Sequence, residues 1–170
     1  MPRFFKLVVV SLLGFPLSVI SATPETKVAP APNGIEIPKH YKDWKLMGSS
    51  LRNDKNSLRV ILGNHIAQDA IRNNETNPWP DGAILAKLVW KAKELPTWPQ
   101  ALVPGQFEHA EFMLKDQHKY SATGGWGYAR WLGMEQKPYG NDKNSDQECL
   151  ACHTKVKNND YVFTIPAKLP

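Results

Sequence analysis

Hydrophobic and polar residues alternate along four short stretches of the chain, which is the pattern of β-strands with one buried side. The first is 57–62, where Leu58, Val60 and Leu62 share one side. The same pattern predicts strands over 83–91, 107–115 and 124–131. Because residues two apart lie on the same face of a strand, Leu85, Lys87 and Val89 are expected to point the same way.

One helix is predicted between the first two strands. Asn64 is a good N-cap residue, and the apolar residues after it fall on one helical face: Ile66, Ala67, Ala70 and Ile71. The stretch 73–82 is rich in Asn and Pro and predicts turns. Short strands with few helices favour an α+β fold, mainly an antiparallel β-sheet with a few short helices.

The N-terminus has the layout of a secretory signal peptide. Arg3 and Lys6 precede an apolar run over 7–20, and small residues follow at Ser21 and Ala22. We therefore expect a signal peptide over 1–22 and a periplasmic protein, with an uncleaved membrane anchor as the alternative. Residues 23–40 are rich in Pro and predict an extended leader that is ordered only where it packs on the domain. One domain is expected over 41–170.

The charge balance is mild and does not favour a nucleic-acid partner. The formal net charge is +5, and it falls to about +3 when Arg3 and Lys6 leave with the signal peptide. No run of five or six basic residues is present. The sequence therefore gives no indication of nucleic-acid binding.

The run Cys-Leu-Ala-Cys-His at 149–153 is the strongest chemical signal. Ser145 and Glu148 have the spacing of a capping box, which predicts that a helix starts there. On a helix, residues three and four apart share a face, so Cys149, Cys152 and His153 point the same way. Two thiols can then bond the two vinyl groups of one haem while the imidazole binds iron. This is the attachment pattern of one covalent haem c, with His153 as the axial ligand.

Other uses of two close cysteines fit less well. A zinc site takes about four ligands, and there is no second cysteine pair. A redox dithiol belongs in a βαβ context, which the predicted strands do not give. A disulfide is the default in an exported chain, but the histidine directly after the pair favours haem.

The motif lies near the C-terminus, with no Met or His after His153. A sixth iron ligand would have to come from upstream, and each candidate has an ordinary packing or surface interpretation: Met47, Met113, Met134, His40, His65, His109 and His118. We therefore expect five-coordinate iron with an open distal position. Such iron favours ligand binding or chemistry over simple electron transfer.

The chain resembles the cytochrome P-460 family, which includes the beta-type cytochromes c-prime. The resemblance covers about 41–163 and depends on four segments in order: 79–87, 124–131, the motif at 149–153, and 160–163. It implies an antiparallel sheet domain, usually a homodimer, with one covalent five-coordinate haem. The P-460 branch oxidises hydroxylamine and links a lysine nitrogen to a haem carbon. The c-prime branch lacks the link, has an apolar aromatic distal pocket and binds nitric oxide.

Lys87 matches the linking lysine of the family. Its flanking residues on the same strand face, Leu85 and Val89, predict an apolar surface that favours a neutral, nucleophilic amine. A lysine that reaches solvent from a half-exposed strand is the alternative. The family's acid after the haem histidine has no match, because Lys155 and Lys157 occupy that stretch and Asp160 is the first acid after His153.

Three functions follow as hypotheses. The first is an enzyme that oxidises hydroxylamine, with Glu108 or Glu111 taking protons and another cytochrome taking electrons. The second is a nitric-oxide-binding protein with an aromatic pocket drawn from Trp90, Phe107, Phe112, Trp126 or Tyr128. The third is an electron carrier, for which the sequence offers no evident sixth ligand.

Overall fold

The computed structural model describes Met1 and residues 27–168. The predicted signal peptide therefore lies outside the described residues, apart from Met1. Within the part of the chain that is described, no helix is long and apolar enough to cross a membrane.

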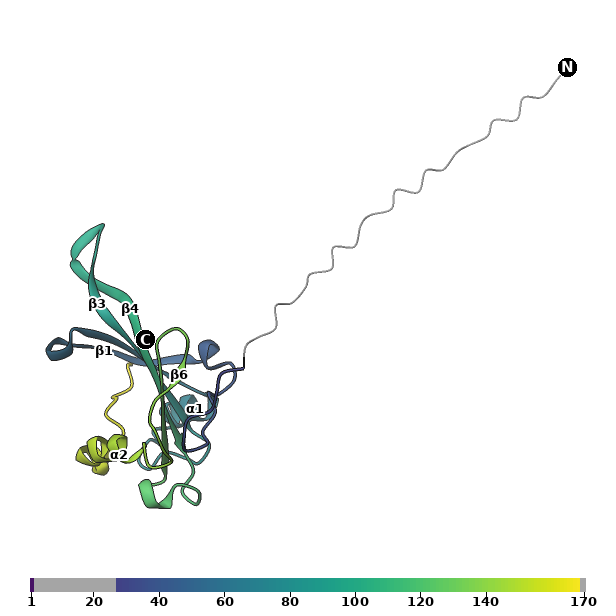
Figure 1. Cartoon of the computed structure of the whole chain (residues 1–170), viewed down its shortest axis with the longest axis vertical. Coiled ribbons are helices and arrows are strands. Elements are labelled where there is room, and N and C mark those ends of the chain that lie inside the picture. The colour runs from purple at the N-terminus through teal and green to yellow at the C-terminus, as the bar shows by residue number, and fades with distance from the viewer. Residues whose placement is uncertain (2–26, 169–170) are drawn as a thin grey trace.

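Six strands form one antiparallel sheet in chain order, so each strand pairs with the next (Figure 1). They are β1 (Lys45–Arg52), β2 (Ser57–Gly63), β3 (Ile84–Leu95), β4 (Trp98–Lys115), β5 (Trp126–Leu132) and β6 (Lys137–Pro138). The helices are α1 (His65–Asn73) and α2 (Gln147–His153), with single-turn or irregular 3-10 segments η1 (Tyr41–Asp43), η2 (Asn53–Lys55), η3 (Ser121–Thr123) and η4 (Thr154–Asn159). The predicted α+β fold with a mainly antiparallel sheet is confirmed.

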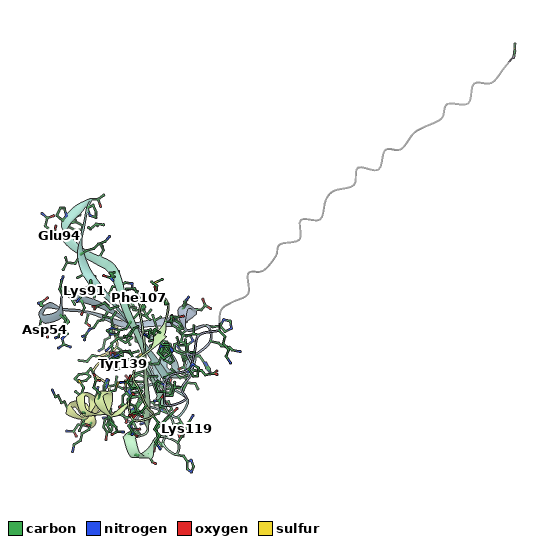
Figure 2. All side chains as sticks on the ribbon, viewed as in Figure 1. Asp54, Lys91, Glu94, Phe107, Lys119 and Tyr139 are labelled. Carbon is green, nitrogen blue, oxygen red and sulfur yellow. The ribbon has the colours of Figure 1, made fainter. Side chains whose placement is uncertain are left out.

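The four predicted strands are present as β2, β3, β4 and β5, but two of them are longer than the sequence indicates. β3 and β4 continue past the sheet as a hairpin, and Figure 2 shows Glu94 near its outer end. The prolines at 96, 99 and 104 made this stretch resemble a loop. β1 was not predicted because a bulge between Leu46 and Gly48 breaks its alternation.

The predicted helix is α1, and it begins as expected. The Asn64 side chain accepts a hydrogen bond from Ala67 N at 3.0 Å and another from Ile84 N at 3.1 Å. It thus caps the helix and ties it to β3. Asn74, in the left-handed region at φ 59°, ends the helix.

One side of the sheet, the leader face, carries an apolar layer of Leu62, Ala86, Ala110, Phe112, Ala129 and Trp131. Ala31 and Ile35 of the Pro-rich leader are buried against it. Trp131 Nε1 donates to Ala29 O at 2.9 Å. Within the described part of the leader, 27–40, these contacts hold Ala29, Ala31 and Ile35 against the sheet.

The other side of the sheet, the α2 face, is covered by α1 and by the C-terminal segment. Ile61, Leu85 and Tyr128 contribute its apolar core together with Ala67 and Ala70 of α1. Cys149 and Leu150 of α2 pack against the same core. The predicted haem motif therefore lies on the face toward which Lys87 points.

Both edges of the sheet are short or covered. β6 has two residues. At the other edge, the tail after η4 returns to β1, where Ala167 N donates to Met47 O at 2.7 Å. A Cβ at Gly48 would lie 3.3 Å from Thr164 Cγ2, so the tail lies close against that strand.

Candidate haem site

The predicted haem motif occupies α2, but the predicted capping box is absent. The N-cap residue is Asp146, which makes no side-chain cap hydrogen bond. Ser145 Oγ instead donates to Asp142 O at 2.6 Å, and Glu148 Oε2 accepts from Tyr139 OH at 2.9 Å. The two residues therefore stabilise the turn before the helix and its contact with residue 139, rather than the helix end itself.

His153 is fixed by one hydrogen bond and two aromatic rings. Its Nδ1 lies 2.6 Å from Tyr161 O, so the protonated Nδ1 donates to that carbonyl and Nε2 is left for a metal. The Tyr128 and Phe163 rings each lie 5.2 Å from the imidazole, centre to centre. Burial lowers the pKa of His153, although the hydrogen bond acts against it. The neutral form that binds iron is therefore favoured.

The two cysteines are free thiols, Cys149 half-buried and Cys152 exposed. Burial raises the pKa of Cys149 to about 11. A redox dithiol needs the opposite shift, because its attacking thiol works as a thiolate. Within the described residues, no three His, Cys, Asp or Glu side chains are grouped to hold a metal ion. The chemistry of this pair fits covalent attachment better than a dithiol centre.

A row of charged side chains crosses the α2 face. Strand register sets Lys87 of β3 opposite Glu111 of β4, and Glu111 opposite Arg130 of β5. Glu111 forms an ion pair with Lys87, and Arg130 Nε donates to Glu111 Oε1 at 2.7 Å. His109 Nε2 lies 3.4 Å from the same oxygen. Glu111 therefore joins three basic side chains from three strands.

The surroundings of Lys87 are only partly as predicted. Leu85 and Val89 are buried beside it, as the alternation indicates. The ion pair with Glu111 was not predicted, because it depends on the register of β3 and β4. The Lys87 side chain is 30% exposed, and its charge acts on both the Cys149 thiol and the His153 imidazole. Lys87 is thus close to the haem motif, in a site more polar than its strand suggests.

Glu111 is held as a carboxylate. Burial alone would raise its pKa, but the charges of Lys87 and Arg130 outweigh this effect and bring it to about 2. Its side chain is 17% exposed. Glu108, the other acid suggested by the sequence, pairs instead with Lys91 at 3.1 Å. Of these two acids, Glu111 is the one that contacts Lys87.

The α2 face has the unsatisfied groups that a haem would cover. Arg59 Nε and Tyr128 OH are buried without a hydrogen-bond partner. Arg59 is paired in register with Val89, on the Lys87 side of the sheet, and lies near enough to Cys152 for an electrostatic interaction. Phe163 is 51% exposed although its ring contacts His153. An apolar surface, a guanidinium with a buried Nε that has no hydrogen-bond partner, and two thiols beside a free imidazole nitrogen together fit a haem with its carboxylates.

Several residues proposed from sequence do not reach this site. Phe112 packs in the leader face, as does Phe107, which forms an edge contact with Trp90 at 5.4 Å. Of the predicted aromatic pocket, Tyr128 contacts His153, and Trp126 lies farther along the same face.

Among the candidate sixth ligands, two lie on the α2 face near Lys87. His109 contacts Glu111, and Met113 packs against the apolar core of that face. The remaining five are elsewhere: Met47 in the core, Met134 and His40 exposed, His65 at the start of α1 and His118 exposed in the turn after β4.

Sequence reasoning missed a buried ion pair. Lys115 Nζ lies 2.8 Å from both carboxylate oxygens of Asp160, and both side chains are almost fully buried. The partners are 45 positions apart, and no sequence pattern joins them. Asp160, the first acid after the motif, is therefore held by Lys115 and is not a free base.

Comparison with families of known proteins agrees with this arrangement. The model of the family described as Cytochrome P460 matches residues 38–164, which include the whole sheet, α1, α2 and η4. No curated protein matches the chain. The match covers most of the chain and confirms the resemblance seen in the sequence: this chain belongs to the cytochrome P460 family and is a haem cytochrome of that family.

Proposed function

We propose that the chain is an exported mono-haem c-type cytochrome that oxidises hydroxylamine, with Lys87 and Glu111 acting together beside the haem. Cys149 and Cys152 would hold the haem covalently, and His153 would bind its iron on one side. The haem would supply an open iron position for the substrate nitrogen and a path for electrons. The contact between Lys87 and Glu111 on the α2 face is the observation on which this proposal depends.

Glu111 is placed to move protons. Conversion of hydroxylamine to nitric oxide releases three protons and three electrons, so the site needs a base and the chain needs an electron acceptor of the cytochrome class. Glu111 is an ionised carboxylate among Lys87, Arg130 and His109. A bond from Lys87 Nζ to a haem carbon would replace an N–H and a C–H bond; three protons would be released, counting the ammonium proton, and two electrons would pass to an oxidant of the peroxide class. The linked nitrogen would no longer carry the lysine charge. The pKa of Glu111 would then rise, because its strongest attractive charge would be gone, and the carboxylate would become a better base.

Peptide mapping tests the link directly. Digestion of the holoprotein should give a haem peptide that contains both the 149–153 motif and Lys87. In the same sample, a lysine-linked haem should give a Soret band strongly shifted to the red. Lys87→Leu should return that band to the position of an ordinary c-type haem while Cys149 and Cys152 stay attached.

Activity separates the two candidate acids. Glu111→Gln should lower hydroxylamine oxidation by about 100-fold, the size expected when a general base is lost. Glu108→Gln is the matched control: it changes the same residue type on the same strand but breaks only the pair with Lys91, and it should retain activity. Equal losses in both variants would contradict the role given to Glu111.

A nitric-oxide-binding protein of the beta-type c-prime kind is the second candidate. Lys155 and Lys157 favour it, because both are exposed where active family members are expected to carry a carboxylate. A peptide containing Lys87 at its unmodified mass would support this candidate, and the protein should then bind nitric oxide without oxidising hydroxylamine. A pure low-spin ferric spectrum would instead favour an electron carrier, with His109 or Met113 as the first sixth ligands to test.

Export and partners complete the proposal. The pattern of residues 1–22 supports a periplasmic location, and mass spectrometry of native protein should find an N-terminus near Ala22 or Thr23. An intact Met1 would contradict cleavage of the signal peptide.

The family resemblance supports a homodimer, which sedimentation of the holoprotein would test.

A further inference from the structure

The buried pair of Lys115 and Asp160 lies outside the charged row around Glu111. Its side chains are 2% and 9% exposed, and both Nζ–O distances are 2.8 Å. Lys115 Nζ also lies 4.9 Å from the centre of the Trp126 ring. Burial of two charges carries a large desolvation cost, and an apolar pair of similar size is often at least as stable. A gain in stability is therefore a weak explanation for this pair, whereas control of geometry is a better one.

Asp160 is held from three directions. Lys115 and Trp79 N both bind its carboxylate, the latter at 2.8 Å to Oδ2. Trp126 Nε1 donates to its backbone carbonyl at 2.8 Å. Asp160 and Tyr161 are both in the left-handed region, at φ 45° and 63°, a conformation that must be enforced by its surroundings for such residues. The contacts of Asp160 therefore fix the direction of the peptide that follows it.

That direction determines where the Tyr161 carbonyl points. Gly124 lies directly against the Tyr161 ring, where a Cβ would overlap it, so the residue is also confined from the side of its ring. The carbonyl oxygen lies 2.6 Å from His153 Nδ1. A continuous set of contacts thus runs from Lys115 through Asp160 and Tyr161 to His153.

We propose that Lys115 and Asp160 are positioning residues for His153: they hold the Tyr161 carbonyl where it accepts the Nδ1 proton, and so set how strongly the imidazole donates to iron. This inference depends on the proposed role of His153 as the iron ligand. A short hydrogen bond at Nδ1 gives the ring more imidazolate character. The ring then donates more strongly, favours ferric iron and lowers the reduction potential.

The test uses the holoprotein with three substitutions and one control. Lys115→Met removes the charge but keeps the length of the side chain, and Lys115→Arg restores the charge. Asp160→Asn removes the negative charge but keeps one oxygen that can accept from Trp79 N or Lys115. Trp131→Phe is the control, because it loses the bond to Ala29 and destabilises the leader face without touching this segment. For each protein we would measure the reduction potential, the iron–histidine stretching band of the reduced form, and the free energy of unfolding.

Lys115→Met should raise the reduction potential and lower the frequency of the iron–histidine band. Asp160→Asn should shift both in the same direction by a smaller amount, and it decides the question if Lys115→Met does not fold. Lys115→Arg should return both toward the native values. Trp131→Phe should lose stability with neither value changed.

The inference is overturned if Lys115→Met and Asp160→Asn lose stability while the reduction potential and the iron–histidine band keep their native values. The pair would then have a purely structural role. His153→Ala separates this failure from a failure of the proposed function. If the band persists without His153, the ligand assignment itself is wrong.

Discussion

On the leader face, β3, β4 and β5 set Ala86, Phe112 and Ala129 side by side in one buried apolar row, whereas one position along the same strands, on the α2 face, they set Lys87, Glu111 and Arg130 side by side. The backbone ladder is common to both rows. Both faces carry an apolar core, but at this level of the sheet the leader face is apolar whereas the α2 face holds three charged side chains in contact. The same strands can therefore place packing on one side and a charged site on the other.

The largest expected effect is on the leader face. Trp131 is fully buried, forms an edge contact with Phe112 at 5.6 Å and donates to Ala29 O. Trp131→Ala should lower the free energy of unfolding by about 3–5 kcal/mol, as for other large-to-small core changes. Urea denaturation of the holoprotein measures this loss. The Soret band should not move, and a shift as large as that of a substitution at Glu111 would contradict the separation of the two faces.

A smaller loss is expected on the α2 face. Glu111→Gln removes the carboxylate that Lys87, Arg130 and His109 share. The three basic groups would then be close together without an anion, and we expect a loss of about 2 kcal/mol in the free energy of unfolding. Unlike Trp131→Ala, this change should also alter the haem spectrum. An unchanged spectrum would place Glu111 outside the haem environment.

The pH dependence of stability tests the contribution of the Glu111 carboxylate in a second way. The pKa of Glu111 is lowered to about 2 in the folded protein, so its stabilisation is present above its ordinary pKa and is lost as pH falls toward the folded value. Between about pH 6 and about pH 3, the native protein should lose about 2 kcal/mol more than Glu111→Gln. If the free energies of unfolding of the two proteins fall in parallel with pH, protonation of Glu111 does not contribute to the pH dependence of stability.

The smallest effect is expected away from both faces. Asp54 is exposed at the turn between β1 and β2, where Figure 2 shows it at the tip of that hairpin, and it pairs with Arg52 at 2.6 Å. Solvent screens such a pair. Asp54→Ala should leave the midpoint of urea denaturation unchanged within error. A clear shift would indicate that this hairpin contributes more to the domain than its exposure suggests.

The sequence predicted what depends on local patterns. Alternation located β2 to β5, and Asn64 marked the start of α1. The helix at 149–153 was expected from a capping box of Ser145 and Glu148; the helix is present as α2, but these residues do not cap it. β1 was missed because its bulge removes the alternation, and Ser145 was misassigned because its hydroxyl binds the turn before α2. The pairs of Lys87 with Glu111 and of Lys115 with Asp160 join residues far apart in the chain. Such pairs depend on strand register and on the path of the C-terminal segment, and neither is encoded in a local pattern.

The tail that follows the haem motif has a consequence for self-association. An edge strand offers unpaired backbone groups on which another chain can add a strand. The short β6 offers little of such an edge, and at β1 the bond from Ala167 N to Met47 O and the close approach of Thr164 to Gly48 occupy part of the other. The last residues of the domain therefore protect its first strand from aggregation by edge pairing, and any event that releases them exposes a template for it.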